Sequence, residues 1–313
     1  TYVPTHPHFN PNAIINTRGE TLMDNIEPRN IITPLGNRII ITFLDCGRVQ
    51  VVGPTEASYL VTFVDGDANK AVHRNTITTG KWMATLWKYA VRWRVIIQEN
   101  GVQVVDYTLD WRGKHVWVEL NSTPLGDTVA WLPYAEEFRK KHDCLVHVAT
   151  HHNELFQGQY PHLYFEKPGT ANPDYIYAFY RIDVFDGDPS RNKSNWRTVT
   201  LQQVASDILG LEFKEVRPRL SKTPAPRPIP ERYVVISEFS TLQCKFWNRR
   251  DGWQDLVDYL NSVGLKVMSV SKEPTKLRNV IKRNGLPLEE LIRNTSYAEF
   301  AISLGSGTAW IAW

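Results

Sequence analysis

The chain has 313 residues, of which 42% are hydrophobic and 22% are charged, so it can bury more than one core and does not have the composition of a disordered protein. Its formal net charge of +3 is small for this length and gives no reason to expect nucleic-acid binding. The sequence contains no apolar run of the roughly 20 residues that span a bilayer, and its N-terminus lacks the pattern of a signal peptide. We therefore expect a cytoplasmic protein without membrane insertion.

The first part of the chain has the pattern of an all-β fold. Residues 1–35 show no periodicity and are predicted to form an extended arm, whereas residues 36–112 are predicted to form a small barrel or sandwich. Asn100-Gly101 predicts a hairpin, because both residues tolerate a positive φ. The predicted strands cover residues 39–44, 49–52, 58–64, 89–98 and 102–109.

Residues 113–216 alternate between strand and helix patterns, which predicts a Rossmann-like domain with a parallel sheet. The predicted strands cover residues 116–120, 145–149, 163–165 and 177–184, and the predicted helices residues 128–142 and 201–209. Pro133 should kink the first helix. Residues 217–231 are proline-rich and basic, and we expect them to be a stiff linker between domains.

Residues 232–313 begin a second Rossmann-like domain. The pattern predicts strands at residues 233–237, 265–270 and 300–303, and helices at residues 253–263 and 288–293. Asp251 is predicted to cap the first of these helices. Because a doubly wound domain normally contains further strands and a closing helix, we expect this second domain to be incomplete.

Asp127 is the most informative single residue, because it lies where a predicted strand ends and a predicted helix begins. Open α/β sheets bind their ligands at this edge, and a carboxylate placed there can act as a general base. Asp127 could equally be an N-cap of the helix, and the sequence leaves both interpretations open.

The second Rossmann-like domain offers groups suited to a phosphate. Gly305, Ser306, Gly307 and Thr308 open an apolar segment, and backbone N–H groups at a helix start bind anions. Lys245 would add a mobile positive charge. A turn of this composition is common, however, and a single lysine is usually solvated, so neither signal is specific when taken alone.

Three other groups have structural interpretations that we prefer. Asp65-Gly66-Asp67 and Asp186-Gly187-Asp188 match an Asp-x-Asp pattern with which some enzymes hold a divalent metal, but Asp-Gly turns explain them better. Three histidines lie close together in the sequence but do not have a known metal-ligand spacing, and they are predicted to be structural or exposed: His147, His151 and His152. Three tryptophans are predicted to lie in the core rather than to stack on a sugar: Trp247, Trp253 and Trp310.

The order and spacing of three segments resemble the bacterial autotransporter heptosyltransferases. These segments are residues 123–138, residues 240–248 with Gly252-Trp253, and residues 302–313. That family is related to the lipopolysaccharide heptosyltransferases, which have the GT-B fold of two Rossmann-like domains. The resemblance implies the same α/β architecture here, with the second domain incomplete and a β-rich domain in front.

The resemblance also implies a reaction, namely transfer of heptose from ADP-heptose to serine hydroxyls of an autotransporter adhesin. By position, Asp127 would be the general base and Lys245 would neutralise the leaving diphosphate. Thr123 and Gly126 would shape the turn beside the donor. The residues implied to face the phosphates are Ser240, Thr241, Gly305, Ser306, Gly307 and Thr308.

The chain departs from its relatives in two places. Lipopolysaccharide heptosyltransferases usually have an acid before the last glycine motif, whereas Leu304-Gly305-Ser306 has none. The autotransporter branch has an iron-binding finger of four cysteines, which nothing in this sequence matches, so we assign no cofactor or metal ligand. Fe(III) would enter only if such a finger followed Trp313.

Two alternatives remain at this point. The chain could be a non-catalytic scaffold for nucleotide sugars or carbohydrates, or an inactive fragment. It could also be a lipopolysaccharide heptosyltransferase, but the β-rich domain would then have no role. In the leading hypothesis that domain docks the protein acceptor or builds a homo-oligomer.

Overall fold

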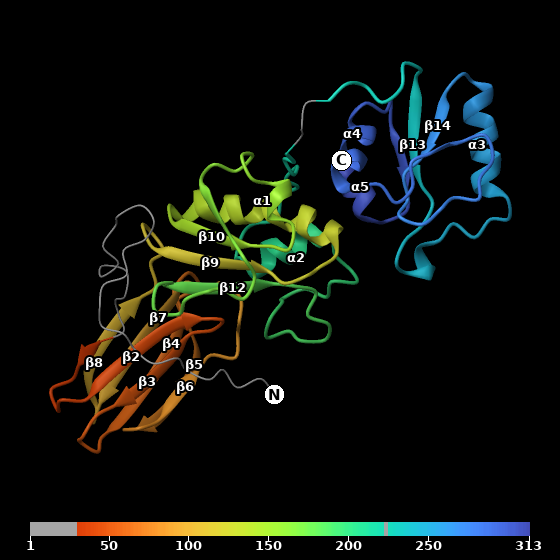
Figure 1. The fold of residues 1–313 in the computed structure, drawn as a ribbon. Helices are drawn as coiled ribbons and strands as arrows, with labels where there is room; N and C mark the ends of the chain where they lie inside the picture. The colour runs from red at the N-terminus through yellow and green to blue at the C-terminus, as the bar shows by residue number, and fades with distance from the viewer. Residues whose placement is uncertain (1–29, 222–224) are drawn as a thin grey trace. The chain divides into compact units, whose positions relative to one another are not determined.

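The structure is a computed structural model that describes residues 30–221 and 225–313 (Figure 1). Most of the predicted arm and three residues of the predicted linker lie outside the described residues. The chain divides into two compact units, which are described separately. The first comprises the described residues up to Trp117 together with His142–Leu145 and Thr170–Tyr180, and the second comprises Val118–Lys141, Val146–Gly169 and the described residues from Arg181. The five predicted domain ranges stay predictions.

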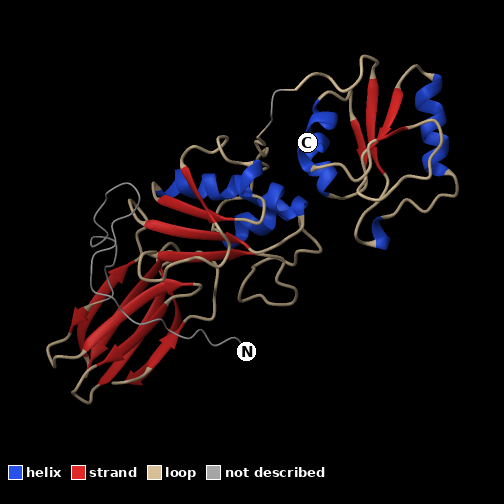
Figure 2. Cartoon of the chain, in the orientation of Figure 1, coloured by secondary structure: helices blue, strands red, loops and turns tan. Residues whose placement is uncertain are grey.

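The first unit is rich in antiparallel strands, which Figure 2 shows in red. One sheet has the order β5-β4-β7-β8, with β4 (Ser58–Asp65), β5 (Lys70–Thr78), β7 (Trp93–Glu99) and β8 (Val102–Thr108). β1 (Ile31–Ile32), β2 (Arg38–Leu44), β3 (Arg48–Val52) and β6 (Trp82–Ala84) pair in a second set. Alternate side chains of β2 and β4 are fully buried, as expected for strands with one face toward a core.

The hairpin prediction is confirmed, because β7 and β8 pair antiparallel across Asn100 and Gly101, whose φ angles are 49° and 86°. Three strands of this unit were not predicted: β1, β5 and β6. Every residue of β5 except Ile77 is exposed or half-buried. Its sequence therefore does not alternate between apolar and polar side chains. β1 and β6 are too short to show a period.

The first half of the second unit contains the predicted βαβ elements. Its strands are β9 (His115–Leu120), β10 (Leu145–Ala149), β11 (Leu163–Glu166) and β12 (Ala178–Ile182). They follow the order β11-β10-β9-β12 in an eight-stranded sheet, which continues through β2, β3 and β6 because β12 pairs parallel with β2. β9 and β12 begin in the first unit and end in the second. They run in the same direction, since Tyr177 N–H donates to His115 and Asn121 N–H donates to Ile182. The helices are α1 (Leu125–His142), α2 (Leu201–Ile208) and the short η2 (Asn153–Leu155).

Helix α1 differs from its prediction at the N-terminal end. It begins at Leu125 rather than Thr128, so Asp127 is the third helical residue and not the N-cap. The interpretation of Asp127 as a simple N-cap is therefore wrong. Pro133 lies within α1, and the helix continues on both sides of it.

The second half of this unit has a parallel sheet of order β15-β14-β13-β16. Its strands are β13 (Tyr233–Ser237), β14 (Lys266–Ser269), β15 (Ile281–Lys282) and β16 (Ala301–Ser303). Its helices are α3 (Gly252–Ser262), α4 (Leu288–Ser296), α5 (Gly307–Ala312) and the one-turn η3 (Gln243–Lys245). Figure 1 shows α3 on one face of this sheet and α4 on the other. Val234 and Ile236 pack on the α3 side, whereas Tyr233 and Val235 pack on the α4 side.

Asp251 occupies the N-cap position of α3, but it does not cap the helix as predicted. Its φ is 54°, and its side chain makes no capping hydrogen bond. A left-handed backbone turns the carboxylate away from the first N–H groups of the helix. No helix among the described residues is both long enough and apolar enough to cross a membrane.

Candidate functional site

Asp127 lies at the carboxyl end of β9, in the first turn of α1. Ser122, which follows the strand, donates a hydrogen bond of 2.5 Å from its Oγ to Oδ2 of Asp127. The turn between β9 and α1 therefore folds back on the helix that it introduces. This bond fixes one carboxylate oxygen of Asp127 and leaves the other for a ligand.

The surroundings of Asp127 raise its pKa above the ordinary value of 3.8. Burial is the main cause, and the negative charge of Asp183 adds to it. The hydrogen bond from Ser122 and the charge of Lys245 act in the opposite direction. A carboxylate with a raised pKa holds a proton more strongly, which suits a general base.

Asp183 is the second carboxylate at this edge and was not singled out from the sequence. It follows β12, whose end is joined to the end of β9 by a bond of 3.1 Å from Asn121 N–H to the Ile182 carbonyl. Asn121 also donates from Nδ2 to Oδ2 of Asp183 over 2.8 Å. The sequence offered no signal for it, because Asp183 lies inside the strand predicted at residues 177–184, whereas β12 ends at Ile182.

Thr123 and Gly126 complete the turn. The carbonyl of Thr123 lies 3.0 Å from Nε2 of His152, so this histidine supports the turn and not a metal ion. Gly126 is buried, and a Cβ on it would lie 3.0 Å from Trp310 and 3.4 Å from Cα of Gly307. A Cβ at this position would force Trp310 to move by a few tenths of an ångström, so glycine favours this close approach of the first turn of α1 to the start of α5.

Lys245 and Ser240 meet at the carboxyl ends of two neighbouring parallel strands, β13 and β16. Nζ of Lys245 donates to the carbonyl of Gly305 over 3.1 Å, and Oγ of Ser240 donates to the same carbonyl over 3.4 Å. Two donors from the loop after β13 thus converge on one oxygen of the loop after β16. Thr241 lies exposed between them in the sequence.

The Gly305–Thr308 segment opens α5 as predicted, with Ser306 at the N-cap position. The Ser306 side chain does not cap the helix, and its Oγ instead lies 3.1 Å from Oγ of Ser303. Thr308 is only 8% exposed, so little of its surface can meet a ligand. Lys245, Ser240 and the backbone of Gly305 are the better-placed members of the predicted phosphate site.

A buried carboxylate, Glu238, anchors the loop that carries Ser240 and Lys245. Its N–H donates to Oγ of Ser271 over 3.0 Å, and Ser271 donates back to its Oε2 over 2.8 Å. Ser269 also donates to the carboxylate, over 3.1 Å, and Asn284 donates to Ser269 over 2.9 Å. The network links the carboxyl ends of β13, β14 and β15. No sequence motif indicates this network, because its members follow three separate strands.

The structural interpretation holds for both Asp-Gly motifs. Asp65 accepts hydrogen bonds from the N–H groups of Asp67 and Ala68, which is an ordinary Asx turn. Gly187 has a φ of 69°, and Asp186 pairs with Arg197. The described residues contain no group of three or more histidine, cysteine or acidic side chains that could hold a metal ion.

The tryptophan prediction is correct for one residue and wrong for another. Trp253 packs against the core between β13 and α3. Trp247 is 42% exposed and stands edge-on to Trp253, with ring centres 5.4 Å apart. It lines a pocket of about 290 Å³ beside the loop that carries Lys245, together with Glu238 and Phe246. Its position directly after η3 places it at the surface.

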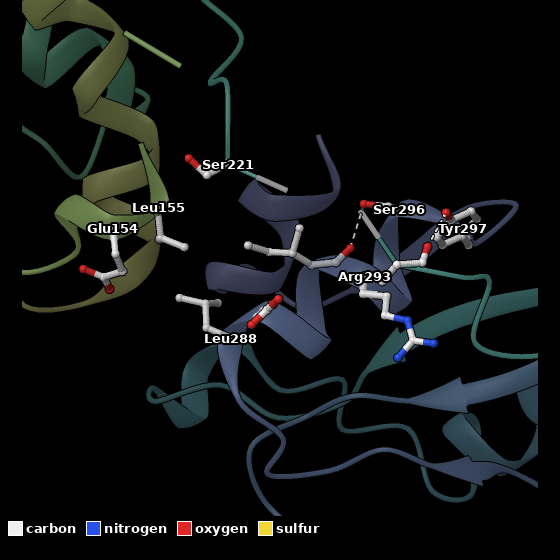
Figure 3. A pocket seen from close by; sticks show the side chains of 10 residues that line it. Glu154, Leu155, Ser221, Leu288, Arg293, Ser296 and Tyr297 are labelled. Carbon is white, nitrogen blue, oxygen red and sulfur yellow. Dashed lines mark hydrogen bonds between the residues drawn. The ribbon is translucent and has the colours of Figure 1, made fainter. Parts of the chain in front are cut away.

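A separate cavity of about 590 Å³ is drawn in Figure 3. It is lined by Leu155 of η2, by Ser221 and Ala225, and by residues of α4 that include Leu288 and Arg293. None of the predicted site residues lines it. The candidate site is therefore not this cavity but the group of loops at the carboxyl ends of the strands.

Comparison with known proteins identifies relatives over most of the chain. No protein-family model matches it. The autotransporter heptosyltransferase BAHTCr of Citrobacter rodentium is 32% identical over 92% of this chain and 73% of its own length. The autotransporter heptosyltransferase TibC of Escherichia coli is 31% identical over 92% of this chain and 74% of its own length. An inactive autotransporter heptosyltransferase, BimC of Burkholderia thailandensis, is 28% identical over 72% of this chain and 56% of its own length.

Solved structures of TibC have the same fold. The structure of TibC from enterotoxigenic E. coli, an iron-containing dodecameric glycosyltransferase, superposes with a TM-score of 0.81 at 30% identity, covering 88% of this chain and 75% of TibC. A second structure, of TibC in complex with ADP-D-beta-D-heptose, also gives a TM-score of 0.81, at 29% identity over 91% of this chain and 77% of TibC. The mixed α/β fold is therefore that of TibC.

Iron does not fit the part of the chain that the structure describes. The side chains that bind iron in proteins come in clusters of cysteine, histidine or carboxylate, and the described residues hold no such cluster. The acid that is usual before the last glycine motif is also missing here, because Leu304 occupies that region.

The family resemblance is confirmed by these relatives, two of which are at least 31% identical over more than nine-tenths of the chain. The expectation of a glycosyltransferase is confirmed with it, because TibC is described as a glycosyltransferase. The chain belongs to the autotransporter heptosyltransferase family.

Proposed function

We propose that the chain is a GT-B glycosyltransferase that moves heptose from ADP-heptose to serine hydroxyls of an autotransporter adhesin. The observation that carries this proposal is the placement of Asp127, a half-buried carboxylate of raised pKa at the carboxyl end of a parallel strand, in a chain of this family. Ligands of open α/β sheets bind at this edge.

Asp127 is the general base of the proposed reaction. The serine oxygen attacks the anomeric carbon of heptose, its proton passes to a carboxylate oxygen of Asp127, and the bond from the anomeric carbon to the phosphate oxygen breaks. A serine hydroxyl is a poor nucleophile unless a positioned base accepts its proton. The Ser122 bond to Oδ2 orients the carboxylate for this transfer.

Lys245 neutralises the leaving diphosphate, which departs with the electron pair of the broken bond. Charge that develops on a leaving group is stabilised by donors that are fixed before the reaction. Nζ of Lys245 and Oγ of Ser240 already point at a common oxygen, the carbonyl of Gly305, and a phosphate oxygen is a stronger acceptor for both. Thr241 and the N–H groups of residues 306–308 complete the phosphate site.

The proposed architecture and partners follow from the relatives. The two sheets of the second unit are the two Rossmann-like domains of a GT-B enzyme, and the β-rich first unit docks the adhesin or builds a homo-oligomer. TibC is dodecameric and was solved with ADP-D-beta-D-heptose, which supports an ADP-heptose donor and self-association here.

The test is a transfer assay with purified protein, ADP-heptose and a fragment of a candidate autotransporter adhesin. Intact-mass spectrometry should show added heptose, and peptide mapping should place it on serine. The variant Asp127→Asn should lose transfer by about a hundredfold or more, as expected for removal of a general base. Asp186→Asn, an exposed acid paired with Arg197, is the matched control and should keep full activity. Full activity of Asp127→Asn would remove Asp127 from the mechanism.

The second candidate is a non-catalytic scaffold that binds nucleotide sugars. The similarity to the inactive BimC favours keeping it. In that case the protein would bind ADP-heptose but add no mass to any adhesin fragment.

A further inference from the structure

Asn121 and Ser122, which directly follow β9, each donate a hydrogen bond to a different carboxylate. Ser122 Oγ donates to Asp127 over 2.5 Å, and Asn121 Nδ2 donates to Asp183 over 2.8 Å. The second carboxylate is further fixed by the Val184 N–H, which donates to its Oδ1 over 2.7 Å. One strand end thus holds both acids in defined positions.

The donors to Asp183 are neutral. Among the described residues, its carboxylate accepts from the Asn121 amide and the Val184 N–H, and it forms no ion pair with a lysine or arginine. Other acids nearby are paired differently, for example Asp186 with Arg197 and Glu119 with Arg181. The negative charge of Asp183 is therefore left uncompensated beside the turn that carries Asp127.

We propose that Asp183 is a positioning residue of the transfer reaction, which acts on Asp127 through the Asn121-Ser122 strand end and makes Asp127 a stronger proton acceptor. This inference rests on the proposed function, in which Asp127 is the base. Like charges held close together disfavour ionisation of both, so the neighbour of a base increases its affinity for a proton.

Three groups act on Asp127 from three elements. Asp183, at the end of β12, strengthens proton binding, whereas Ser122, at the end of β9, and Lys245, in η3, weaken it. The first two can be removed separately by small substitutions. Removing the charge of Asp183 should lower the affinity of Asp127 for a proton, whereas removing the Ser122 hydroxyl should raise it. A general loss of structure would not produce these opposite changes.

The experiment compares Asp183→Asn and Ser122→Ala with the wild type in pH profiles of heptose transfer. A base must be ionised, so the rate falls on the acid side as pH drops through the pKa of Asp127. We expect Asp183→Asn to move this acid limb to lower pH and Ser122→Ala to move it to higher pH. The plateau rate of Asp183→Asn should also fall by about threefold, because proton abstraction becomes slower as the basicity of Asp127 decreases.

Controls make the result specific. Asn121→Ala releases Asp183 without removing its charge and should give a smaller shift in the same direction as Asp183→Asn. Asp186→Asn makes the same chemical change three residues along the chain and should leave the profile unchanged. Equal thermal melting temperatures would exclude misfolding. An unmoved acid limb in Asp183→Asn, with transfer intact, would overturn the inference.

A second readout does not need activity. In protein labelled with 13C at the aspartate carboxyl groups, the Asp127 signal can be assigned by its loss in Asp127→Asn and then titrated by NMR. Its midpoint should drop in Asp183→Asn. If transfer fails in the wild type but the midpoint still drops, the proposed function is wrong and the coupling of the two acids stands. A midpoint that does not move refutes the coupling, whether or not transfer occurs.

Discussion

Lys245 is the residue on which donor affinity should depend most. Its Nζ is exposed and is held by a single bond to the Gly305 carbonyl, so a phosphate can replace this partner at little cost. We expect Lys245→Ala to weaken binding of ADP by about 1–3 kcal/mol, which is roughly 5- to 150-fold in Kd, because a charge-assisted bond is lost. Isothermal titration calorimetry with ADP measures this directly.

The control for this measurement is Lys266→Ala. Lys266 is an exposed lysine of the same sheet, but it starts β14 and so lies at the amino edge, opposite the loops that carry Ser240 and Lys245. Its removal changes net charge equally and should leave the Kd unchanged. Equal losses in the two variants would mean that only the overall charge attracts ADP, and Lys245 would have no specific role.

At the same scale, the sequence could indicate single residues but not their partners. Asp127 and Lys245 could be selected because each follows a recognisable strand and lies in a spaced motif. Asp183 could not, because its meaning comes from the pairing of β9 with β12, which are separated by more than fifty residues in the chain. Hydrogen bonds between strand ends are set by sheet order, and sheet order is a property of the tertiary fold.

Among the elements, the loop after β13 should depend on Glu238. We expect Glu238→Ala to leave the hydroxyls of Ser269 and Ser271 without their acceptor, which costs about 1–3 kcal/mol of stability. Because the loop proposed to bind the phosphates starts at this residue, donor affinity should fall as well, while Glu238→Gln, which keeps an acceptor oxygen, should recover most of both. Chemical denaturation and calorimetry separate the two effects. A destabilised Glu238→Ala with unchanged ADP affinity would make the network purely structural.

Helix α1 is tied to the segment after α2 through Glu137. Its carboxylate accepts from Lys140 over 3.0 Å and from Lys214 over 2.5 Å. Burial opposes ionisation, but the hydrogen bonds from the two lysines outweigh it and hold the pKa of Glu137 below its usual 4.5. Both lysines are more than half exposed, so solvent weakens the pairs.

A depressed pKa of a carboxyl group stabilises the fold only when the group is ionised. Glu137→Gln should therefore lower the free energy of unfolding by about 0.5–1 kcal/mol at pH 7. The difference from the wild type should be complete above the usual glutamate pKa of 4.5 and should vanish as pH falls through the lower folded value. Urea denaturation at pH 7 and at a series of lower pH values measures it, and a loss that does not diminish as the pH falls would point to packing instead.

Element prediction succeeded where one face or both faces of an element are buried. β9, β10 and β13 are buried at nearly every position, and their bounds were predicted to within one residue. β5 was missed because its side chains are mostly exposed, so edge pairing rather than burial makes it a strand. The early start of α1 was missed because Gly126 is a weak helix former, and its packing against Gly307 and Trp310 overrides that propensity.

At the scale of the whole molecule, every proposed site residue belongs to the second unit. Thr123, Gly126 and Asp127 lie in its first half, and the residues from Ser240 to Thr308 lie in its second half. The first unit contributes none of them. The proposed donor binding and proton transfer therefore involve no residue of the first unit, and we expect substitutions in that unit to leave both unchanged.

The same division gives a prediction for the intact protein. A ligand that binds only the folded state stabilises it by RT ln(1 + [L]/Kd), which is about 2.7 kcal/mol at a hundred times the Kd. ADP should therefore raise the melting temperature of the second unit by several degrees, and Lys245→Ala should lose most of this rise at the same ADP concentration. Asp127→Asn should keep the rise, because it binds the donor but cannot accept the proton.

Differential scanning calorimetry with ADP, read beside the transfer assay, then decides between the two candidate functions. A transferase should show stabilisation by ADP and transfer in the wild type, with only transfer lost in Asp127→Asn. A binding scaffold should show stabilisation in both proteins and transfer in neither. If ADP fails to stabilise the wild type, both candidate functions are contradicted, because both require a nucleotide site. The convergence of Ser240 and Lys245 on the Gly305 carbonyl would then not mark a phosphate-binding site.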